Sequence, residues 1–284
     1  MAMTAHDFDT IRGLVKQASG LVIGPEHREI VEARLSSLAE RRGITSVAGL
    51  ISALRDNDDD PLRPRAVRAI ASVSPVLGFD SPSCSLLVGI LFPDLLERRR
   101  ERAALRIWCA DCGCGQNPHG IAVLMREHFP FTAAWKITIL ATDRSAAHLE
   151  RMRSGSFSRA DIDHVPPELL ARHFRPMGME WQIDGDLGRQ VEFRTLGLGD
   201  GPLPEGRFDL VILGDSLPYY DRARQQEIVS RLRALLEPDG YLLLGSEAKP
   251  ADLGTWGGWD SCHAPGCYRP ATMDAPVLRT ETGF

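Results

Sequence analysis

The sequence predicts an α/β domain that follows a small all-α domain, and three observations support this fold class. Beyond residue 104, apolar runs of strand length, such as Lys136–Asp143 and Phe208–Asp215, alternate with amphipathic segments of helix length. A glycine-containing turn, Gly113–Gly115, separates the first of these strands from the next helix. Before residue 73 the spacing of apolar residues is helical, with polar interruptions. Strands that alternate with helices indicate a largely parallel sheet.

We divide the chain into an N-terminal helical domain (1–72), a linker with one helix (73–104), an α/β domain (105–270) and a tail (271–284). Helical spacing predicts four helices in the first part: one before Gly20, one from Glu26 to Arg41–Gly43, one after Ser46, and one over residues 64–71. A further apolar helix is predicted from Cys84 to Leu96.

Within the α/β domain, residues 105–110 predict the first strand. Further helices are expected over 118–129, 145–153, 167–174 and 221–236, and strands over 137–142, 208–215 and 241–245. Residues 161–195 contain short alternating segments, at Trp181/Ile183 and at Val191/Phe193. This alternation predicts a small antiparallel insert.

The first glycine turn and the end of the next strand predict a ligand site. Gly113 and Gly115 follow a buried strand, and Asp143 ends the next strand roughly 20 to 30 residues later, where such folds place an acid on a ribose. Asp143 also fits as the cap of a helix near Ser145. The turn lacks the G-x-G-x-x-G pattern, and no Lys follows it as a P-loop requires. S-adenosylmethionine is therefore the predicted ligand.

Three of the six cysteines crowd this turn as Cys109, Cys112 and Cys114. Thiolates at this spacing fit zinc or an iron–sulfur cluster, with His119 or a distant Cys as fourth ligand. They also fit small residues that fill a tight turn in a reducing compartment. The second interpretation is preferred, and no metal is predicted.

Charge and hydropathy exclude some functions. A net charge of -5 argues against a surface built for nucleic acid. No apolar run approaches the ~20 residues of a membrane span, and no signal-peptide pattern opens the chain. We expect a cytoplasmic, monomeric protein.

Several ordered motifs carry a resemblance to a known family. They are Trp108–Ile121, Ala141-Thr142-Asp143, Leu149–Phe157, Phe208–Tyr220, Pro238–Glu247 and Tyr268-Arg269. From about Phe8 to Arg269 the chain resembles the chemotaxis receptor glutamate methyltransferases, the CheR family. The resemblance implies a Rossmann-like S-adenosylmethionine-dependent methyltransferase domain with an antiparallel insert, preceded by a small helical domain. It also implies methyl transfer to glutamate side chains of a chemoreceptor or related signalling protein.

The same resemblance assigns site residues. Tyr219 is placed near the reacting carboxylate as the catalytic residue. The residues assigned to S-adenosylmethionine or S-adenosylhomocysteine are Ser74, Val76, Asp80, Gly113, Gly115, Gln116, Asp143, Gly197, Leu198, Asp215 and Ser216.

Several of these positions depart from the family pattern. Asp80 stands where the family has an Arg that anchors the methionine carboxylate, and losing such a pair costs about 1.5–3 kcal/mol. An acidic pair has become Gln116-Asn117, an Arg-Asn pair has become Gly214-Asp215, and Gly197 replaces an Asn. Two alternatives therefore stay open: a catalytically degenerate binding or signalling module, and methyl transfer to another substrate through a remodelled pocket.

Three arginines of the helical domain, Arg34, Arg41 and Arg42, lie at near-helical spacing. The preferred interpretation is a solvated helix face whose cations favour the helix C-terminus. The alternative predicts that these arginines form a surface that docks an acidic partner helix, such as a receptor helix.

Overall fold

The computed structural model describes residues 3–19, 23–56, 62–71, 79, 81–112, 116–144, 146–162, 165–198, 202–214, 216–217, 220, 222–245, 253 and 258–271. The longer helices are α1 (Ala5–Ser19), α2 (Arg28–Arg41), α3 (Val47–Asp56), α4 (Leu62–Ala71), α5 (Pro82–Leu86), α6 (Phe92–Arg98), α7 (Gln116–His128), α8 (Ala146–Ser154), α9 (Pro167–His173), α10 (Gly185–Gly188) and α11 (Arg222–Leu235). Single-turn elements are η1 (Pro25–His27), η2 (Leu87–Leu91), η3 (Pro130–Ala134) and η4 (Arg159–Asp161). The strands are β1 (Ala104–Ala110), β2 (Lys136–Asp143), β3 (Ser156–Ser158), β4 (Phe174–Met177), β5 (Glu180–Ile183), β6 (Val191–Thr195), β7 (Phe208–Leu213), β8 (Leu236–Leu244), β9 (Trp259–Ser261) and β10 (Cys267–Pro270).

The four helices α1 to α4 are those that the helical spacing predicts, and they share one apolar core. Phe8, Ile11 and Val15 of α1 pack with Val31 and Leu35 of α2 in that core. Among the described residues, no helix has the length and apolar character needed to cross a bilayer.

The main sheet has seven strands in the order β6-β2-β1-β7-β8-β10-β9. Strands β6, β2, β1, β7 and β8 run parallel, whereas β10 is antiparallel to both β8 and β9. The predicted parallel α/β fold is therefore confirmed. The helix predicted over 84–96 is also present, as the continuous run α5–η2–α6, which Ser81 caps by accepting a hydrogen bond from the Cys84 N–H.

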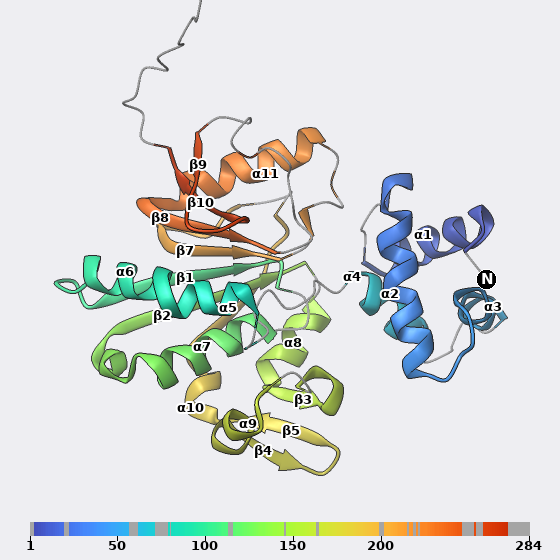
Figure 1. Ribbon diagram of the computed structural model, residues 1–284, viewed down its shortest axis with the longest axis horizontal. Coiled ribbons are helices and arrows are strands. Elements are labelled where there is room, and N and C mark those ends of the chain that lie inside the picture. Colours follow the sequence, from blue (N-terminus) through green and yellow to red (C-terminus); the bar gives the residue numbers. More distant parts are fainter. Residues whose placement is uncertain are drawn as a thin grey trace, which may run out of the picture.

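Side-chain alternation divides the sheet into two buried faces. On β1, Ile107 and Cys109 join one core, while Trp108 and Ala110 join the other. The first core is covered by helices α5 to α8, and the second by α11, which lies alongside β7 and β8 (Figure 1). Because both faces are buried, the central strands are almost continuously apolar, as the sequence shows.

The antiparallel insert is built from β3, β5 and β4, in that order. The prediction that Val191–Phe193 belongs to the insert is wrong, because β6 pairs in parallel with β2 and forms an edge of the main sheet. An edge strand is half exposed, so it alternates in the same way as an insert strand does. The insert (yellow-green) and the β9–β10 hairpin (red) lie toward opposite ends of the sheet in Figure 1.

The buried carboxylate of Asp209, at the start of β7, binds three arginine residues. Asp209 is 0% exposed and accepts hydrogen bonds from the Arg99 Nε (2.6 Å), from Arg102, and from the Arg106 backbone N–H (2.7 Å). Arg99 also forms a bidentate pair with Asp239, at the start of β8. These contacts join α6, β1, β7 and β8 at the amino ends of the strands.

Candidate functional site

The carboxyl ends of β1 and β7 lie side by side at the point where the strand order of the sheet reverses. From β1 the chain proceeds to β2 and β6 on one side, and from β7 to β8 on the other. Ala110, which ends β1, is in register with Leu213, which ends β7, and Asp143 is in register with Thr195. In α/β sheets, ligands bind outside the strand ends at such a switch point.

The turn after β1 is held by the end of β2. Asp111 adopts a positive φ of 52°, a backbone conformation that non-glycine residues rarely take. The next N–H, of Cys112, donates to the Thr142 carbonyl at 3.0 Å, and the Trp108 Nε1 donates to the Thr142 hydroxyl at 3.0 Å. Asp111 and Cys112 are therefore held against the end of β2, and the residues that follow, Gly113–Gly115, lie outside the described residues.

Asp143 lies at the predicted place, at the carboxyl end of β2, and is buried at 5% exposure. Its carbonyl accepts a hydrogen bond from the Leu196 N–H at 2.9 Å, which brings the segment after β6 alongside. Gly197 and Leu198, both assigned to the cofactor by resemblance, are in this segment. The structure therefore brings these three predicted residues together. The capping alternative for Asp143 involves Ser145, which the structure does not describe.

A hollow of about 360 Å³ opens beside this segment, lined by Arg144, Thr195, Leu196, Gly197 and Pro202. Arg144 lies against Gly197, and a Cβ at Gly197 would approach the Arg144 Cγ to 3.0 Å. The Asn that the family has at this position therefore fits only if Arg144 moves.

The segment after β7 buries one polar side chain. Ser216 is 3% exposed, and its Oγ has no hydrogen-bond partner within the part of the chain that the structure describes. An unpaired buried hydroxyl is destabilising, by about 1–3 kcal/mol, unless a ligand or water completes it. Ser216 therefore fits a polar ligand group at this edge of the sheet.

The remaining predicted site residues cannot be placed. Ser74, Val76, Asp80, Gly113, Gly115, Asp215 and Tyr219 lie outside the described residues, as does the side chain of Gln116. Of the arginines predicted to bind a partner, Arg34 donates to the Ile70 carbonyl at 2.7 Å and so joins α2 to α4. Arg42 is exposed, and the Arg41 side chain is not described.

Two of the three cysteines at the turn, Cys109 and Cys112, are buried free thiols. Burial raises the pKa of both Cys109 and Cys112 well above the usual thiol value, which disfavours the thiolate that a metal requires. No group of three His, Cys, Asp or Glu side chains is arranged as metal ligands among the described residues, which do not include Cys114.

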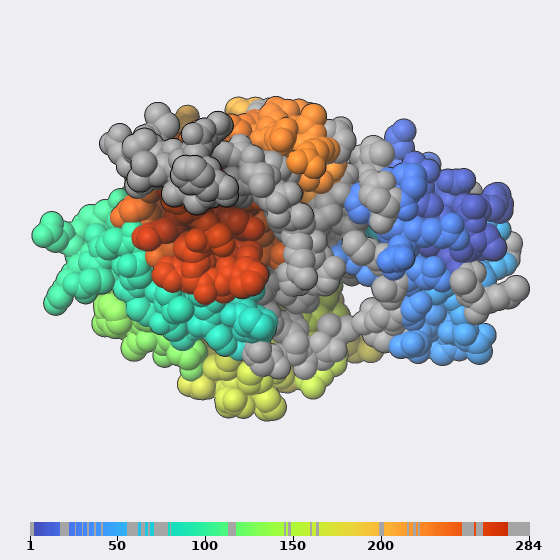
Figure 2. Space-filling view, turned by 45° about the horizontal axis from the view of Figure 1, so that its top comes forward, coloured from blue at the N-terminus to red at the C-terminus, as the bar shows by residue number. Residues whose placement is uncertain are grey.

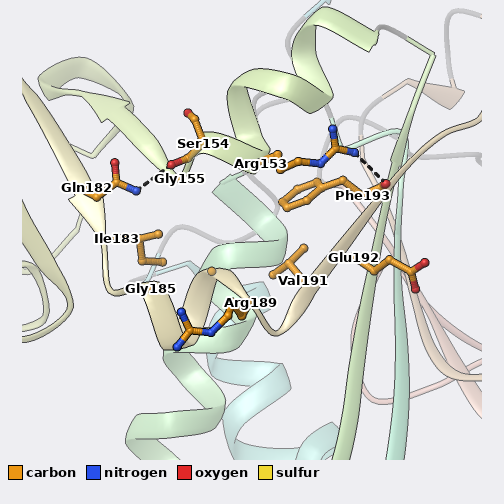
Figure 3. A pocket seen from close by; sticks show the side chains of 11 residues that line it. Arg153, Ser154, Gly155, Gln182, Ile183, Gly185, Arg189, Val191, Glu192 and Phe193 are labelled. Atoms are coloured by element: carbon orange, nitrogen blue, oxygen red, sulfur yellow. Dashed lines mark hydrogen bonds between the residues drawn. The ribbon is translucent and has the colours of Figure 1, made fainter.

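A second cleft, of about 490 Å³, separates the insert from the edge strand β6 (Figure 3). Its polar side chains are already engaged: Arg153 donates to the Phe193 carbonyl at 3.2 Å, and Gln182 donates to the Ser154 carbonyl at 2.7 Å. Arg189 is paired with Asp186. This cleft lies along the beginning of β6, away from the strand ends that hold Asp143.

Comparison with known proteins adds independent information. Residues 80–252 match the family described as "CheR methyltransferase, SAM binding domain", and residues 6–70 match "CheR methyltransferase, all-alpha domain". "Chemotaxis protein methyltransferase Cher2" of Pseudomonas putida is 28% identical over 246 residues, which cover 84% of this chain and 89% of that protein. "Chemotaxis protein methyltransferase 1" of Pseudomonas aeruginosa is 29% identical over 252 residues, covering 87% and 91% respectively.

Proposed function

Because the chain belongs to the CheR methyltransferase family, we propose that it transfers a methyl group from S-adenosylmethionine to a glutamate side chain of a chemoreceptor helix. The match of residues 80–252 to the S-adenosylmethionine-binding domain carries this proposal. The names of its relatives support the chemotaxis setting. We also propose that the protein acts in the cytoplasm, which is consistent with the five described cysteines being free thiols.

The residues at the carboxyl ends of β2, β6 and β7, namely Asp143, Gly197, Leu198 and Ser216, form what we call the strand-end site, and they offer suitable groups for the cofactor. The Asp143 carboxylate would accept hydrogen bonds from ribose hydroxyls, and the Ser216 Oγ, which has no hydrogen-bond partner among the described residues, would meet a further polar group of the cofactor. Gly197 and Leu198 lie next to Asp143 and would contact the same ligand. When bound, the cofactor supplies an activated methyl group on a sulfonium, which is a good leaving group.

The protein's contribution is mainly to position the reactants. A glutamate carboxylate is already a nucleophile at neutral pH, so no general base is needed. Holding a carboxylate oxygen in line with the methyl group can supply much of the rate, because oriented reactants avoid the loss of translational and rotational entropy. By resemblance, Tyr219 is assigned to a place near this carboxylate.

Methylation of a receptor fragment tests the proposal. The full chain is incubated with S-adenosylmethionine labelled in its methyl group and with a purified cytoplasmic fragment of a chemoreceptor. We expect label in the fragment that alkali releases as methanol, because only a carboxyl methyl ester is labile in this way. Asp143→Asn is the matched variant, and it should lose most of the labelling.

Other results would assign a different function. Alkali-stable label would indicate a nitrogen acceptor and a remodelled substrate site. Absence of label together with undetectable S-adenosylhomocysteine binding would indicate a binding or signalling module.

A further inference from the structure

The hairpin formed by β9 and β10 carries two cysteines that face each other across its loop. The Sγ atoms of Cys262 and Cys267 lie 3.5 Å apart. A disulfide has an S–S distance of about 2.0 Å, so the sulfurs need to approach by only about 1.5 Å to form a bond. Neither residue is among those assigned to the cofactor or to the methyl acceptor.

The backbone holds the two residues in this arrangement. The Cys262 N–H donates to the Cys267 carbonyl at 3.0 Å, and the Cys267 N–H donates to the Ala264 carbonyl at 3.1 Å. Gly266 has a φ of 88°, and its carbonyl accepts from the Leu244 N–H at 2.8 Å, which ties the loop to β8. Because the loop is fixed before any S–S bond exists, bond formation requires little further ordering.

The two thiols differ in access. Cys262 is partly exposed, whereas Cys267 is 0% exposed. The β9–β10 segment (red) forms part of the surface seen in Figure 2. The other described cysteines, Cys84, Cys109 and Cys112, are buried. A reagent in solution therefore reaches Cys262 before these other thiols.

Hydrogen bonding and charge favour the reactive thiolate form at Cys262, the more accessible of the two thiols. The pKa of Cys262 is lowered because the Cys267 thiol donates a hydrogen bond to it, and the charge of Arg269 adds to this effect. The pKa of Cys267 is raised, through the same hydrogen bond and through burial. Thiolates are the attacking species in thiol–disulfide exchange.

We propose that Cys262 and Cys267 form a site for oxidation by small disulfides such as oxidised glutathione, with Cys262 as the attacking thiol and Cys267 as the resolving thiol. The Cys262 thiolate bonds to one sulfur of oxidised glutathione, and the other glutathione leaves as a thiolate that takes up a proton. Cys267 then loses its proton and attacks the Cys262 sulfur, which releases the second glutathione. The two protein thiols are oxidised by two electrons in total, and one oxidised glutathione is reduced to two glutathione molecules.

The experiment treats the purified full chain with oxidised glutathione, alkylates the remaining thiols, and maps all cysteines in proteolytic fragments by mass spectrometry. In the unaltered protein we expect an internal disulfide between Cys262 and Cys267. In Cys267→Ala we expect glutathione to remain on Cys262, because no resolving thiol is present. In Cys262→Ala we expect Cys267 to react at least about tenfold more slowly than Cys262 reacts in Cys267→Ala, because Cys267 is buried.

Two results would overturn the proposal. One is an unaltered protein in which both residues are alkylated while oxidised glutathione modifies another cysteine. The other is equal modification rates in the two variants, which would show that access and hydrogen bonding do not assign the roles. Circular dichroism establishes that each variant is folded, and Cys267→Ser replaces Cys267→Ala if the latter is not.

Discussion

Replacing Ser216 with Ala separates a ligand-binding role from a structural one, because the two roles predict opposite effects. The Ser216 Oγ is buried and has no hydrogen-bond partner among the described residues, so within that part of the structure its desolvation is not compensated. Removing an unsatisfied buried hydroxyl should stabilise the free protein by about 1 kcal/mol or more. For a domain of this size, that corresponds to a rise in Tm of roughly 2–4 °C.

The same substitution should weaken ligand binding. If S-adenosylhomocysteine completes the hydroxyl, Ser216→Ala removes one hydrogen bond, worth about 0.5–1.5 kcal/mol. The Kd should therefore rise by roughly 2- to 10-fold. Thermal unfolding without ligand and calorimetric titration with it measure the two effects on one preparation.

Thr132→Val is the matched control. Thr132 is also buried, at 4% exposure, but its hydroxyl donates to the Phe129 carbonyl at 2.7 Å. This variant should lose about 1 kcal/mol of stability and leave the Kd unchanged. A Ser216→Ala protein that is less stable and binds the ligand normally would refute the assignment of Ser216 to the site.

Three further predictions concern aspartate side chains. Asp143→Asn should raise the Kd for S-adenosylhomocysteine by roughly 10- to 100-fold, because hydrogen bonds to a charged acceptor are worth about 1.5–3 kcal/mol. An unchanged Kd in calorimetric titration would contradict the role of Asp143 in cofactor binding. Asp209→Asn should lower the free energy of unfolding by about 3–5 kcal/mol, since it leaves buried Arg99 partly uncompensated, and urea unfolding with a loss below about 1 kcal/mol would contradict this. The pKa of Asp239 is lowered from 3.8 to about 2, first by its hydrogen bond with Arg99. Its contribution to stability is therefore fully present above about pH 4 and is lost as the pH falls through about 2, so the difference in urea unfolding between the unaltered protein and Asp239→Asn should shrink over this window and not at higher pH.

The strand and helix order was predictable because the central strands are buried on both faces. Strands β1 (Ala104–Ala110) and β7 (Phe208–Leu213) are apolar except for one charged residue each, Arg106 and Asp209, and amphipathic helices separate them from the next strands. The assignment of β6 to the insert was wrong because a half-exposed edge strand has the pattern of an antiparallel strand. Strands β9 and β10 were not predicted, since three or four residues give too short a periodicity to recognise.

The site was predictable where function depends on position along a strand, and not where it depends on contacts between distant residues. Asp143 directly follows an apolar strand, so its place at the strand end was evident from the sequence. The hydrogen bond from Trp108 to Thr142 and the pairing of Arg99 with Asp209 join residues 34 and 110 positions apart, and no local pattern indicates them. The approach of Cys262 to Cys267 depends on the hairpin, which was itself not predicted.

Calorimetric titration of the full chain with S-adenosylhomocysteine tests the central claim most directly, because methyl transfer requires the cofactor site at the ends of β1, β2 and β7. The account predicts saturable one-to-one binding in the micromolar range, and strong weakening by Asp143→Asn. An unaltered, folded protein that shows no binding at millimolar ligand would contradict the claim that these strand ends hold the cofactor.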